Sequence, residues 1–236
     1  MVNEVLGIIP AKGLSKGLPN KNLYSFCGKP LVQWTIEASM RSRYITRTVV
    51  SSDSDKILRL SRKLKADAIE RPAELATDIA SNENVIEHTV NYLSQTEGYR
   101  PDVLVLLQPT SPLRTCEDID RAMELYFESG CSAVISGYEL ERNPLKSFLI
   151  NGEGRLTAIM DDKYPFLPRQ QLPRAFGPNG AIYIVKAELF METHCLLTDD
   201  TKPFFMDKQK SIDIDTIEDL KAAAKFNQRC LLNSQA

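Results

Sequence analysis

The first forty residues combine a short apolar run, a basic loop and the pattern of a helix, in that order. Residues 5–9 are apolar apart from one glycine, as expected of a strand that is buried on both faces. Pro10 ends this run, and a helix pattern begins after Pro30, a residue that fits the first turn of a helix. A buried strand followed by a loop and a helix is the starting unit of an α/β fold. Such folds bind ligands at the carboxyl edge of the sheet.

The loop between this strand and helix predicts a phosphate site. Residues 10–22 contain two glycines, two prolines and three lysines, Lys12, Lys16 and Lys21. Glycine lets backbone amides approach an anion closely, and the ammonium groups add positive charge, so a polyphosphate is the favoured ligand. The loop matches neither G-x-x-x-x-G-K-[ST] nor G-x-G-x-x-G, which excludes the two common phosphate-binding fingerprints. Taken alone, the loop fits a solvated basic turn equally well.

Apolar runs and amphipathic stretches alternate along most of the chain. The predicted buried strands are residues 5–9, 47–53, 66–70, 103–107, 132–136 and 181–185. Helices are expected after Pro30 and over residues 83–93, 117–129 and 216–226. A further helix is expected to be capped by Ser52 or Asp53 and to run through Leu64. This alternation predicts an α/β fold with a mostly parallel sheet, right-handed crossovers and helices on both faces. The length fits a single domain over residues 1–236.

Charge and cysteine content exclude several classes of protein. The formal charge of −2 leaves no basic excess for a general nucleic-acid binder. Five scattered cysteines without a C-x-x-C pair indicate neither a disulfide framework nor a zinc site. No apolar run approaches membrane-spanning length, and the start of the chain lacks the pattern of a leader. We therefore expect a reduced, cytoplasmic protein whose partners include neither nucleic acid nor a membrane.

Gln108 directly follows the most apolar predicted strand, residues 103–107. Pro109 and Pro112 stiffen the turn after it, so the Gln108 amide is expected at the same sheet edge as the basic loop. An amide carries both a donor and an acceptor, which suits recognition of the edge of a nucleobase. The alternative is a turn residue that caps its own backbone.

Asp213 and Asp215 alternate with isoleucines near the end of the chain. In an extended segment this spacing places both carboxylates on one face, close enough to share a cation. With no histidine or cysteine nearby, Mg²⁺ is the expected ion, with phosphate oxygens completing its shell. In the competing interpretation Asp215 caps the following helix, with Glu218 at its third position, which leaves Asp213 without a role.

The strand and helix pattern is interrupted at residues 143–180. This stretch holds five prolines, and its basic residues include Lys146, Arg169 and Arg174. We predict an insertion of irregular or antiparallel pieces that serves as an arm for dimerisation. Its basic residues fit either solvated charges or partners of a carboxylate substrate.

Five stretches, in this order along nearly the whole chain, resemble the acylneuraminate cytidylyltransferases. They are Lys12-x-x-Ser15-Lys16-Gly17-x-Pro19-x-Lys21-Asn22, Arg71-Pro72, Gln108-Pro109-Thr110-Ser111-Pro112-Leu113-Arg114, Arg169-Gln170-Gln171-Leu172-Pro173 and Asp213-Ile214-Asp215-Thr216. The resemblance implies a Rossmann-like nucleotidyltransferase fold and the transfer of CMP from CTP to the anomeric hydroxyl of an acidic nine-carbon sugar. Pyrophosphate is the expected second product, and the insertion is expected to contribute to a homodimer and to sugar binding.

The resemblance also implies roles for individual residues. Those expected to hold the triphosphate, or to lie near the nucleotide, are Lys12, Ser15, Lys16, Lys21 and Asn22, with the three lysines acting in catalysis. Those expected to contact the cytidine are Arg71, Ser81 and Gln108. The acidic sugar is expected to meet Lys146, Arg169 and Gln108, and Mg²⁺ to bind Asp213 and Asp215.

One position departs from the family pattern, because Lys12 stands where arginine is usual. Lysine keeps the positive charge but lacks the bidentate fork of arginine. Neither His88 nor His194 is assigned as a general base. The motifs leave legionaminic acid open beside sialic acid as the acceptor, with pseudaminic acid and Kdo as further alternatives. A nucleotide-binding homologue without catalytic activity is the alternative from another class, and only Lys12 favours it.

Overall fold

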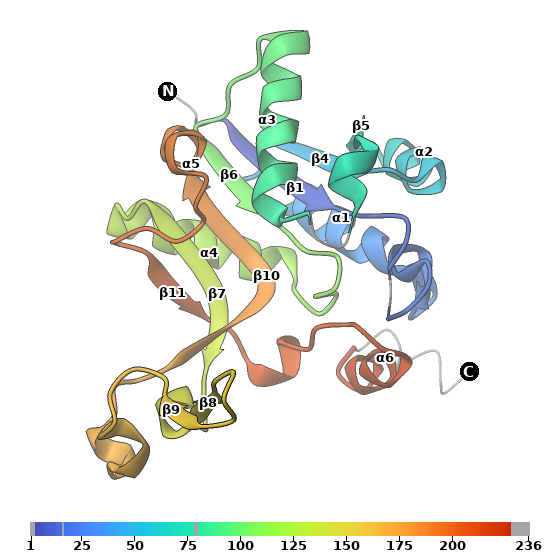
Figure 1. Cartoon of the computed structure of the whole chain (residues 1–236). Coiled ribbons are helices and arrows are strands. Elements are labelled where there is room, and N and C mark those ends of the chain that lie inside the picture. The colour runs from blue at the N-terminus through green and yellow to red at the C-terminus, as the bar shows by residue number, and fades with distance from the viewer. Residues whose placement is uncertain (1–2, 16, 78–79, 228–236) are drawn as a thin grey trace.

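The computed structural model describes residues 3–15, 17–77 and 80–227, and a single large sheet forms its centre (Figure 1). Within these ranges seven strands pair in the order β11-β7-β10-β6-β1-β4-β5. The strands are β1 (Val5–Pro10), β4 (Arg47–Ser52), β5 (Asp67–Glu70), β6 (Val103–Leu106), β7 (Ala133–Glu139), β10 (Phe176–Lys186) and β11 (Lys202–Phe205). All neighbouring pairs are parallel except those of β10, which runs antiparallel to β6 and β7. The predicted mostly parallel α/β sheet is confirmed.

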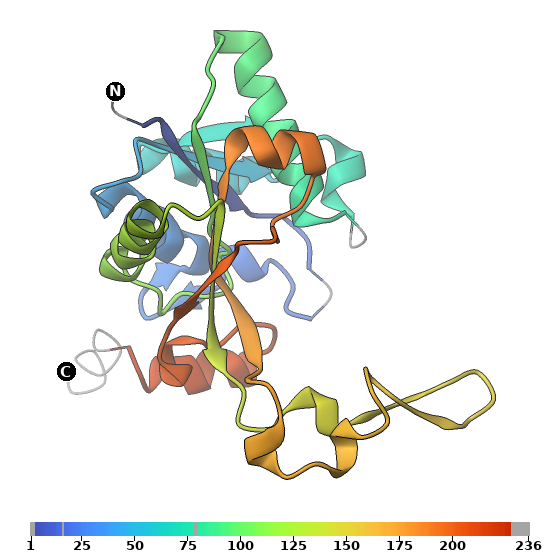
Figure 2. The ribbon, with the colours of Figure 1, turned by 90° about the vertical axis from the view of Figure 1, so that its left-hand side faces the viewer.

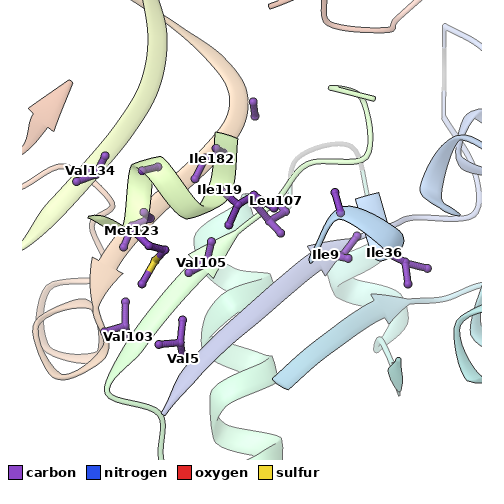
Figure 3. Close-up of a cluster of buried hydrophobic side chains, with 14 of the residues drawn as sticks. Val5, Ile9, Ile36, Val103, Val105, Leu107, Ile119, Met123, Val134 and Ile182 are labelled. Carbon is purple, nitrogen blue, oxygen red and sulfur yellow. The ribbon is translucent and has the colours of Figure 1, made fainter. Parts of the chain in front are cut away.

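Helices cover both faces of the sheet. The helices are α1 (Leu31–Arg41), α2 (Asp55–Lys63), α3 (Asn82–Glu97), α4 (Cys116–Ser129), α5 (Ala187–Thr193) and α6 (Ile217–Ala224). Alternate strand side chains point to opposite faces, so Val105 packs in one cluster with residues of α1 and α4 (Figure 3). Its neighbour Leu104 packs in a second cluster with residues of α3 and α5. These two clusters form the hydrophobic core on the two faces of the central strands.

A third, smaller hydrophobic cluster lies under the carboxyl edge of the sheet. Leu18 of the first loop, Leu113 of the turn after β6, Ile214 and Leu220 of α6 are all buried in it. Segments far apart in the sequence are therefore packed together directly beneath the predicted site. Burial of such side chains stabilises the arrangement by about 1.5–3 kcal/mol for each fully buried Leu or Ile.

A short hairpin follows the first loop. It consists of β2 (Ser25–Phe26) and β3 (Lys29–Pro30), joined by Cys27 and Gly28, which both have positive φ. Cys27 is disulfide-bonded, whereas Cys116, Cys131 and Cys195 are free. This bond differs from the expectation of reduced cysteines, and nothing in the cysteine spacing indicates it.

Between β7 and β10 the chain forms an arm, residues 140–175, which projects away from the sheet (Figure 2). Its regular elements are η3 (Pro144–Lys146), β8 (Phe148–Ile150), β9 (Leu156–Ala158), η4 (Tyr164–Phe166) and η5 (Arg169–Gln171). Strands β8 and β9 form a separate antiparallel pair. Residues 176–180 were expected in the insertion but belong to β10, because Phe176 to Pro178 pair with β7.

Two helix starts differ from the predictions. The N-cap of α2 is Ser54, while the Asp53 carboxylate accepts a hydrogen bond from the Gly13 amide of the first loop. The N-cap of α6 is Thr216, which forms a capping box with Asp219. Asp215 is therefore not the cap of this helix. In the parts of the chain that the structure describes, no helix has the length and apolar character needed to cross a membrane.

Candidate functional site

A cavity of about 260 Å³ opens at the carboxyl edge of β1, β5 and β6. It is lined by Pro10, Lys12, Ser15, Lys21, Asn22, Arg71, Thr77, Ala80, Asn82, Val85, Gln108, Pro109, Thr110, Asp213 and Asp215. Eight of the residues singled out from the sequence are in this lining. Four separate stretches of chain are needed to form it, as expected for a ligand site in an α/β fold.

Three hydrogen bonds hold the first loop in shape, two of them within residues 10–22 and one to Asp53 outside the loop. The Asn22 amide donates a hydrogen bond to the carbonyl oxygen of Lys12 at 2.8 Å. The Gly13 amide donates to the Asp53 carboxylate at 2.8 Å, and the Ser15 hydroxyl donates to the Leu18 carbonyl at 2.7 Å. These bonds place Lys12 on the wall of the cavity that also carries Lys21. Lys16 lies outside the described residues, so its predicted role stays a prediction.

Arg71 is a buried cation in the cavity wall. Only 6% of it is exposed, and its guanidinium donates to the Ser51 carbonyl at 2.8 Å and to the Leu75 carbonyl at 3.2 Å. Burial lowers the pKa of Arg71, and the charge of Asp53 opposes that shift. A buried arginine that is held by neutral carbonyl groups keeps positive charge available to an anionic ligand.

The turn that carries Gln108 is fixed by a second buried arginine. Arg114 donates from Nη1 to the carbonyl oxygens of Gln108 (3.3 Å) and Ala181 (2.9 Å), and only 2% of it is exposed. Burial lowers its pKa to about 10. The Gln108 carboxamide packs directly against Gly180, whose φ is +72°. A side chain at position 180 would push this amide aside, and the positive φ favours glycine there.

Asp213 and Asp215 both line the cavity, together with Lys12 and Lys21. Lys21 Nζ lies 2.8 Å from Asp215 Oδ1. Asp213 is accessible from the cavity, yet partial loss of water around its carboxylate raises its pKa, while a hydrogen bond from Thr110 lowers it and the charge of Asp215 raises it further. Two carboxylates that disfavour each other's charge are stabilised by a shared cation.

This donor set fits Mg²⁺, because it offers only carboxylate and hydroxyl oxygens at the edge of an open cavity. Among the described residues no group of three or more His, Cys, Asp or Glu side chains is arranged to hold a metal ion. An ion at Asp213 and Asp215 therefore needs ligands from outside the protein. Phosphate oxygens and water are the usual ones for Mg²⁺.

Three of the residues singled out from the sequence lie outside the lining. The Ser81 hydroxyl accepts a hydrogen bond from the Asn84 amide as the N-cap of α3, although its neighbours Ala80 and Asn82 line the cavity. Lys146 and Arg169 lie in η3 and η5 of the arm, away from the cavity of the same chain. The predicted contacts of these three residues with ligands stay predictions.

Neither histidine lines this cavity. His88 lies on α3, where burial and the positive charge of Arg71 both lower its pKa, and His194 ends α5. Sequence reasoning missed other residues of the site. Thr110 stands within the Gln108 stretch and could have been found there, whereas no spacing pattern indicates Thr77, Asn82 or Val85.

Comparison with known proteins adds relatives of defined activity. A family model described as cytidylyltransferase matches residues 6–235. The N-acylneuraminate cytidylyltransferase of Escherichia coli O18:K1:H7 is 31% identical over 97% of this chain and 53% of its own length. The pseudaminic acid cytidylyltransferase of Campylobacter jejuni is 30% identical over 92% of this chain and 94% of its own length. The CMP-N,N'-diacetyllegionaminic acid synthase of Legionella pneumophila is 32% identical over 99% of this chain and 99% of its own length. The chain spans about half the length of the N-acylneuraminate enzymes it matches.

Two solved structures share the fold. One is CMP:2-keto-3-deoxy-manno-octonic acid synthetase complexed with CTP, with a TM-score of 0.67, 15% identity and coverage of 99% of this chain and 100% of the other. The other is 4-diphosphocytidyl-2C-methyl-D-erythritol synthase from Anaerococcus prevotii, with a TM-score of 0.66, 13% identity and coverage of 95% and 98%. At these identities the likeness supports the predicted nucleotidyltransferase fold.

Proposed function

The chain belongs to the cytidylyltransferase family, and we propose that it transfers CMP from CTP to the anomeric hydroxyl of a nonulosonic acid of the sialic type. Pyrophosphate is the second product. The observation that carries this proposal is the cavity itself, whose lining combines Lys12 and Lys21 with the carboxylates of Asp213 and Asp215 and the amide of Gln108. A basic wall, an acidic pair and an amide are what a magnesium nucleotide with a readable base requires.

In this reaction the sugar hydroxyl attacks the α-phosphorus of CTP in line, and pyrophosphate leaves. The protein contributes mainly by positioning the reactants and by neutralising charge. Lys12 and Lys21 would hold the phosphates, while Arg71 and Gln108 would orient the cytidine. Mg²⁺, when bound between Asp213, Asp215 and the phosphates, would supply further charge neutralisation. We also propose a cytoplasmic enzyme, as predicted from the sequence.

Legionaminic or pseudaminic acid is the second candidate acceptor. The specific observation is similarity, because relatives named for these two acids are 30% and 32% identical over 92% and 99% of this chain. The N-acylneuraminate enzymes are about twice as long as the region that matches.

An assay of pyrophosphate release distinguishes between the candidate acceptor acids. Purified protein is incubated with CTP and Mg²⁺ and with N-acetylneuraminic, legionaminic or pseudaminic acid in parallel, with UTP and ATP as nucleotide controls. We expect release that requires CTP together with one of the acids. Binding of CTP without release for any acid of the panel, Kdo included, would instead indicate a non-catalytic nucleotide binder.

We further propose that the arm forms a homodimer with a second copy of the chain. It exposes a set of large apolar side chains: Phe148, Leu149, Ile150, Leu156, Ile159, Met160 and Phe166. A two-stranded pair cannot bury such a surface by itself, and a concentrated apolar patch marks an interface. Because the arm projects away from the sheet (Figure 2) and neither residue lines the cavity of its own chain, Lys146 and Arg169 would serve the sugar at the cavity of the partner subunit.

Replacing Ile150 and Met160 together by aspartate is expected to convert the dimer to a monomer. Each side chain is 74% exposed in the single chain, so the subunit should still fold. Removing two apolar contacts of about 1.5–3 kcal/mol each should weaken association at least 100-fold. Molar mass from light scattering measures the change, and Leu197→Asp is the control, because Leu197 is 69% exposed outside the arm. A double variant that stays dimeric would place the interface elsewhere.

A further inference from the structure

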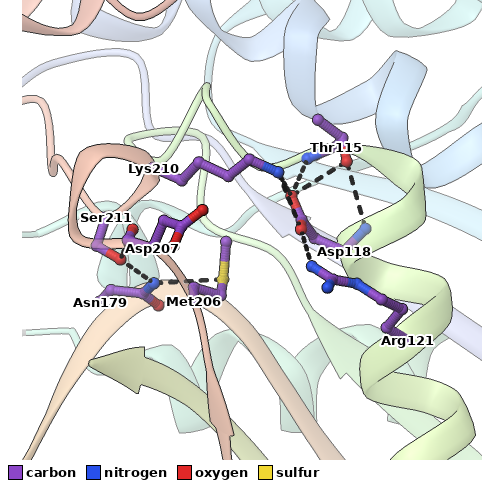
Figure 4. A network of polar contacts seen from close by, with 8 residues as sticks. All are labelled: Thr115, Asp118, Arg121, Asn179, Met206, Asp207, Lys210 and Ser211. Carbon is purple, nitrogen blue, oxygen red and sulfur yellow. Dashed lines mark hydrogen bonds and ion pairs between the residues drawn. The ribbon is translucent and has the colours of Figure 1, made fainter. Parts of the chain in front are cut away.

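Asp213 stands on a segment with little regular structure of its own. After β11 the chain forms only the short helix η6 (Lys208–Lys210) before α6 begins at Ile217. No strand or long helix therefore fixes the position of this carboxylate. One backbone hydrogen bond ties the stretch after η6 to another element: the Ile214 amide donates to the Thr110 carbonyl at 2.9 Å, beside the buried Ile214 side chain. Further contacts of the segment come from side chains of distant elements (Figure 4).

The first of these contacts comes from Asn179, at the irregularity of β10 where the pairing register with β7 shifts. Its Nδ2 donates to Ser211 Oγ at 2.9 Å and to Met206 Sδ at 3.3 Å (Figure 4). Its Oδ1 accepts from Ser136 Oγ at 2.6 Å and from the Ala181 amide at 3.1 Å. With 5% of the residue exposed, every polar atom of this amide is used inside the protein.

The same residue is connected to the turn that carries Gln108. The Ser111 hydroxyl donates to the backbone carbonyl of Asn179 at 3.1 Å. The next residue, Gly180, packs against the Gln108 carboxamide. Asn179 thus joins the turn with Gln108 on one side to Ser211, two residues before Asp213, on the other.

The second contact is an ion pair between Lys210 and Asp118. Lys210 Nζ lies 3.1 Å and 3.0 Å from the two carboxylate oxygens of Asp118, a residue that is 1% exposed (Figure 4). The carboxylate also accepts from the Thr115 amide at 3.0 Å and from Arg121 at 2.7 Å. Burial acts to raise the pKa of Asp118, but these donors outweigh it and the pKa is lowered. The anchor is therefore a fixed charge at the start of α4.

We propose that Asn179 and the Lys210–Asp118 pair are positioning residues, which hold the segment at residues 207–211 so that Asp213 meets the nucleotide-bound metal. The inference rests on the proposed function, in which Asp213 is a metal ligand. Ser211 lies two residues before Asp213, so the contacts at residues 207–211 fix the chain on one side of this carboxylate, while the buried Ile214 fixes it on the other. Mg²⁺ requires oxygen ligands at about 2.0–2.1 Å in near-octahedral geometry, which tolerates little displacement.

The test removes both contacts from the exposed side of the network, where the fold is least at risk. The variant Lys210→Met/Ser211→Ala leaves Asp118 with its other donors and leaves Asn179 in place. We expect the Mg²⁺ concentration for half-maximal pyrophosphate release to rise about 10-fold, as for loss of a group that supports a metal ligand. Mn²⁺ binding in the presence of CTP without sugar acid, measured by electron paramagnetic resonance, should weaken by the same factor.

Three comparisons separate positioning from general stability. At saturating metal the KM for CTP should change less than about two-fold, because the nucleotide contacts themselves remain. Lys210→Arg with native Ser211 should restore the metal dependence. Lys208 lies on the same short helix as Lys210 and forms an exposed ion pair with Glu141. Lys208→Met should leave the metal dependence unchanged.

Unchanged metal dependence in the double variant would overturn the proposal, as would an equal loss of activity at every metal concentration together with a lower melting temperature. Failure of the proposed function is visible separately. In that case the parent protein releases no pyrophosphate, whereas the Mn²⁺ titrations of parent and variant still report whether the two contacts position the site.

Discussion

Replacement of Asp213 by asparagine is expected to lower kcat for CMP transfer by about 100- to 1,000-fold, the range for loss of one charge-stabilising contact at a reacting centre. Asparagine has the same shape but lacks the negative charge that would hold Mg²⁺ at the phosphates. In the metal-free protein the same substitution is expected to leave the folded state at least as stable as in the parent protein. The raised pKa of Asp213 shows that the folded state disfavours its charge, so the neutral amide should keep or increase the melting temperature.

Steady-state rates of pyrophosphate release, together with thermal melting without metal, check both parts of this prediction. Asp207→Asn is the matched control, because Asp207 is an exposed carboxylate in the same segment outside the cavity. Full Mg²⁺-dependent turnover in Asp213→Asn would refute the metal assignment. A lower melting temperature would mean instead that the carboxylate stabilises the fold.

Much of the fold follows from local patterns. The apolar runs that became β1 and β6 are recognisable because strands buried on both faces are almost entirely apolar, whereas only Val49 and Val50 are apolar in β4. Strand direction at the other end of the sheet is not recognisable in this way. Nothing in residues 176–186 shows that β10 runs antiparallel, because direction depends on how the arm returns the chain to the sheet. Cap positions also depend on competition between neighbours, as at Thr216 and Asp215.

The same distinction between local patterns and long-range packing applies to the residues of the site. Residues close together in a motif, such as Lys12 and Lys21, could be assigned to one loop and then to one cavity. Asn179 could not, because its partners Ser136 and Ser211 lie on other elements and have no fixed spacing from it. Long-range packing decides these contacts, and only the folded chain shows them.

The two charged walls of the cavity meet at Lys21. Its ammonium group lies 2.8 Å from Asp215, and its side chain is 13% exposed, so it touches the acidic pair while lining the phosphate side. Without a nucleotide, this ion pair limits repulsion between Asp213 and Asp215. With a nucleotide bound, the same ammonium group can reach the phosphates, where the negative charge of the leaving pyrophosphate develops. Lys21 should therefore matter more for the rate than for the fold.

Lys21→Met is accordingly expected to lower kcat by about 100- to 1,000-fold, because a cation is lost where charge develops in the transition state. Methionine keeps the length and apolar stem of the side chain, so the cavity wall should survive. Single-turnover rates at saturating CTP and Mg²⁺ measure the effect without contributions from binding. Lys29→Met is the control, since Lys29 pairs with Glu37 outside the cavity at 2.6 Å. If Lys21→Met raised only the KM for CTP, the lysine would bind the ground state and transition state equally, and charge stabilisation would have to come from Lys12 and the metal.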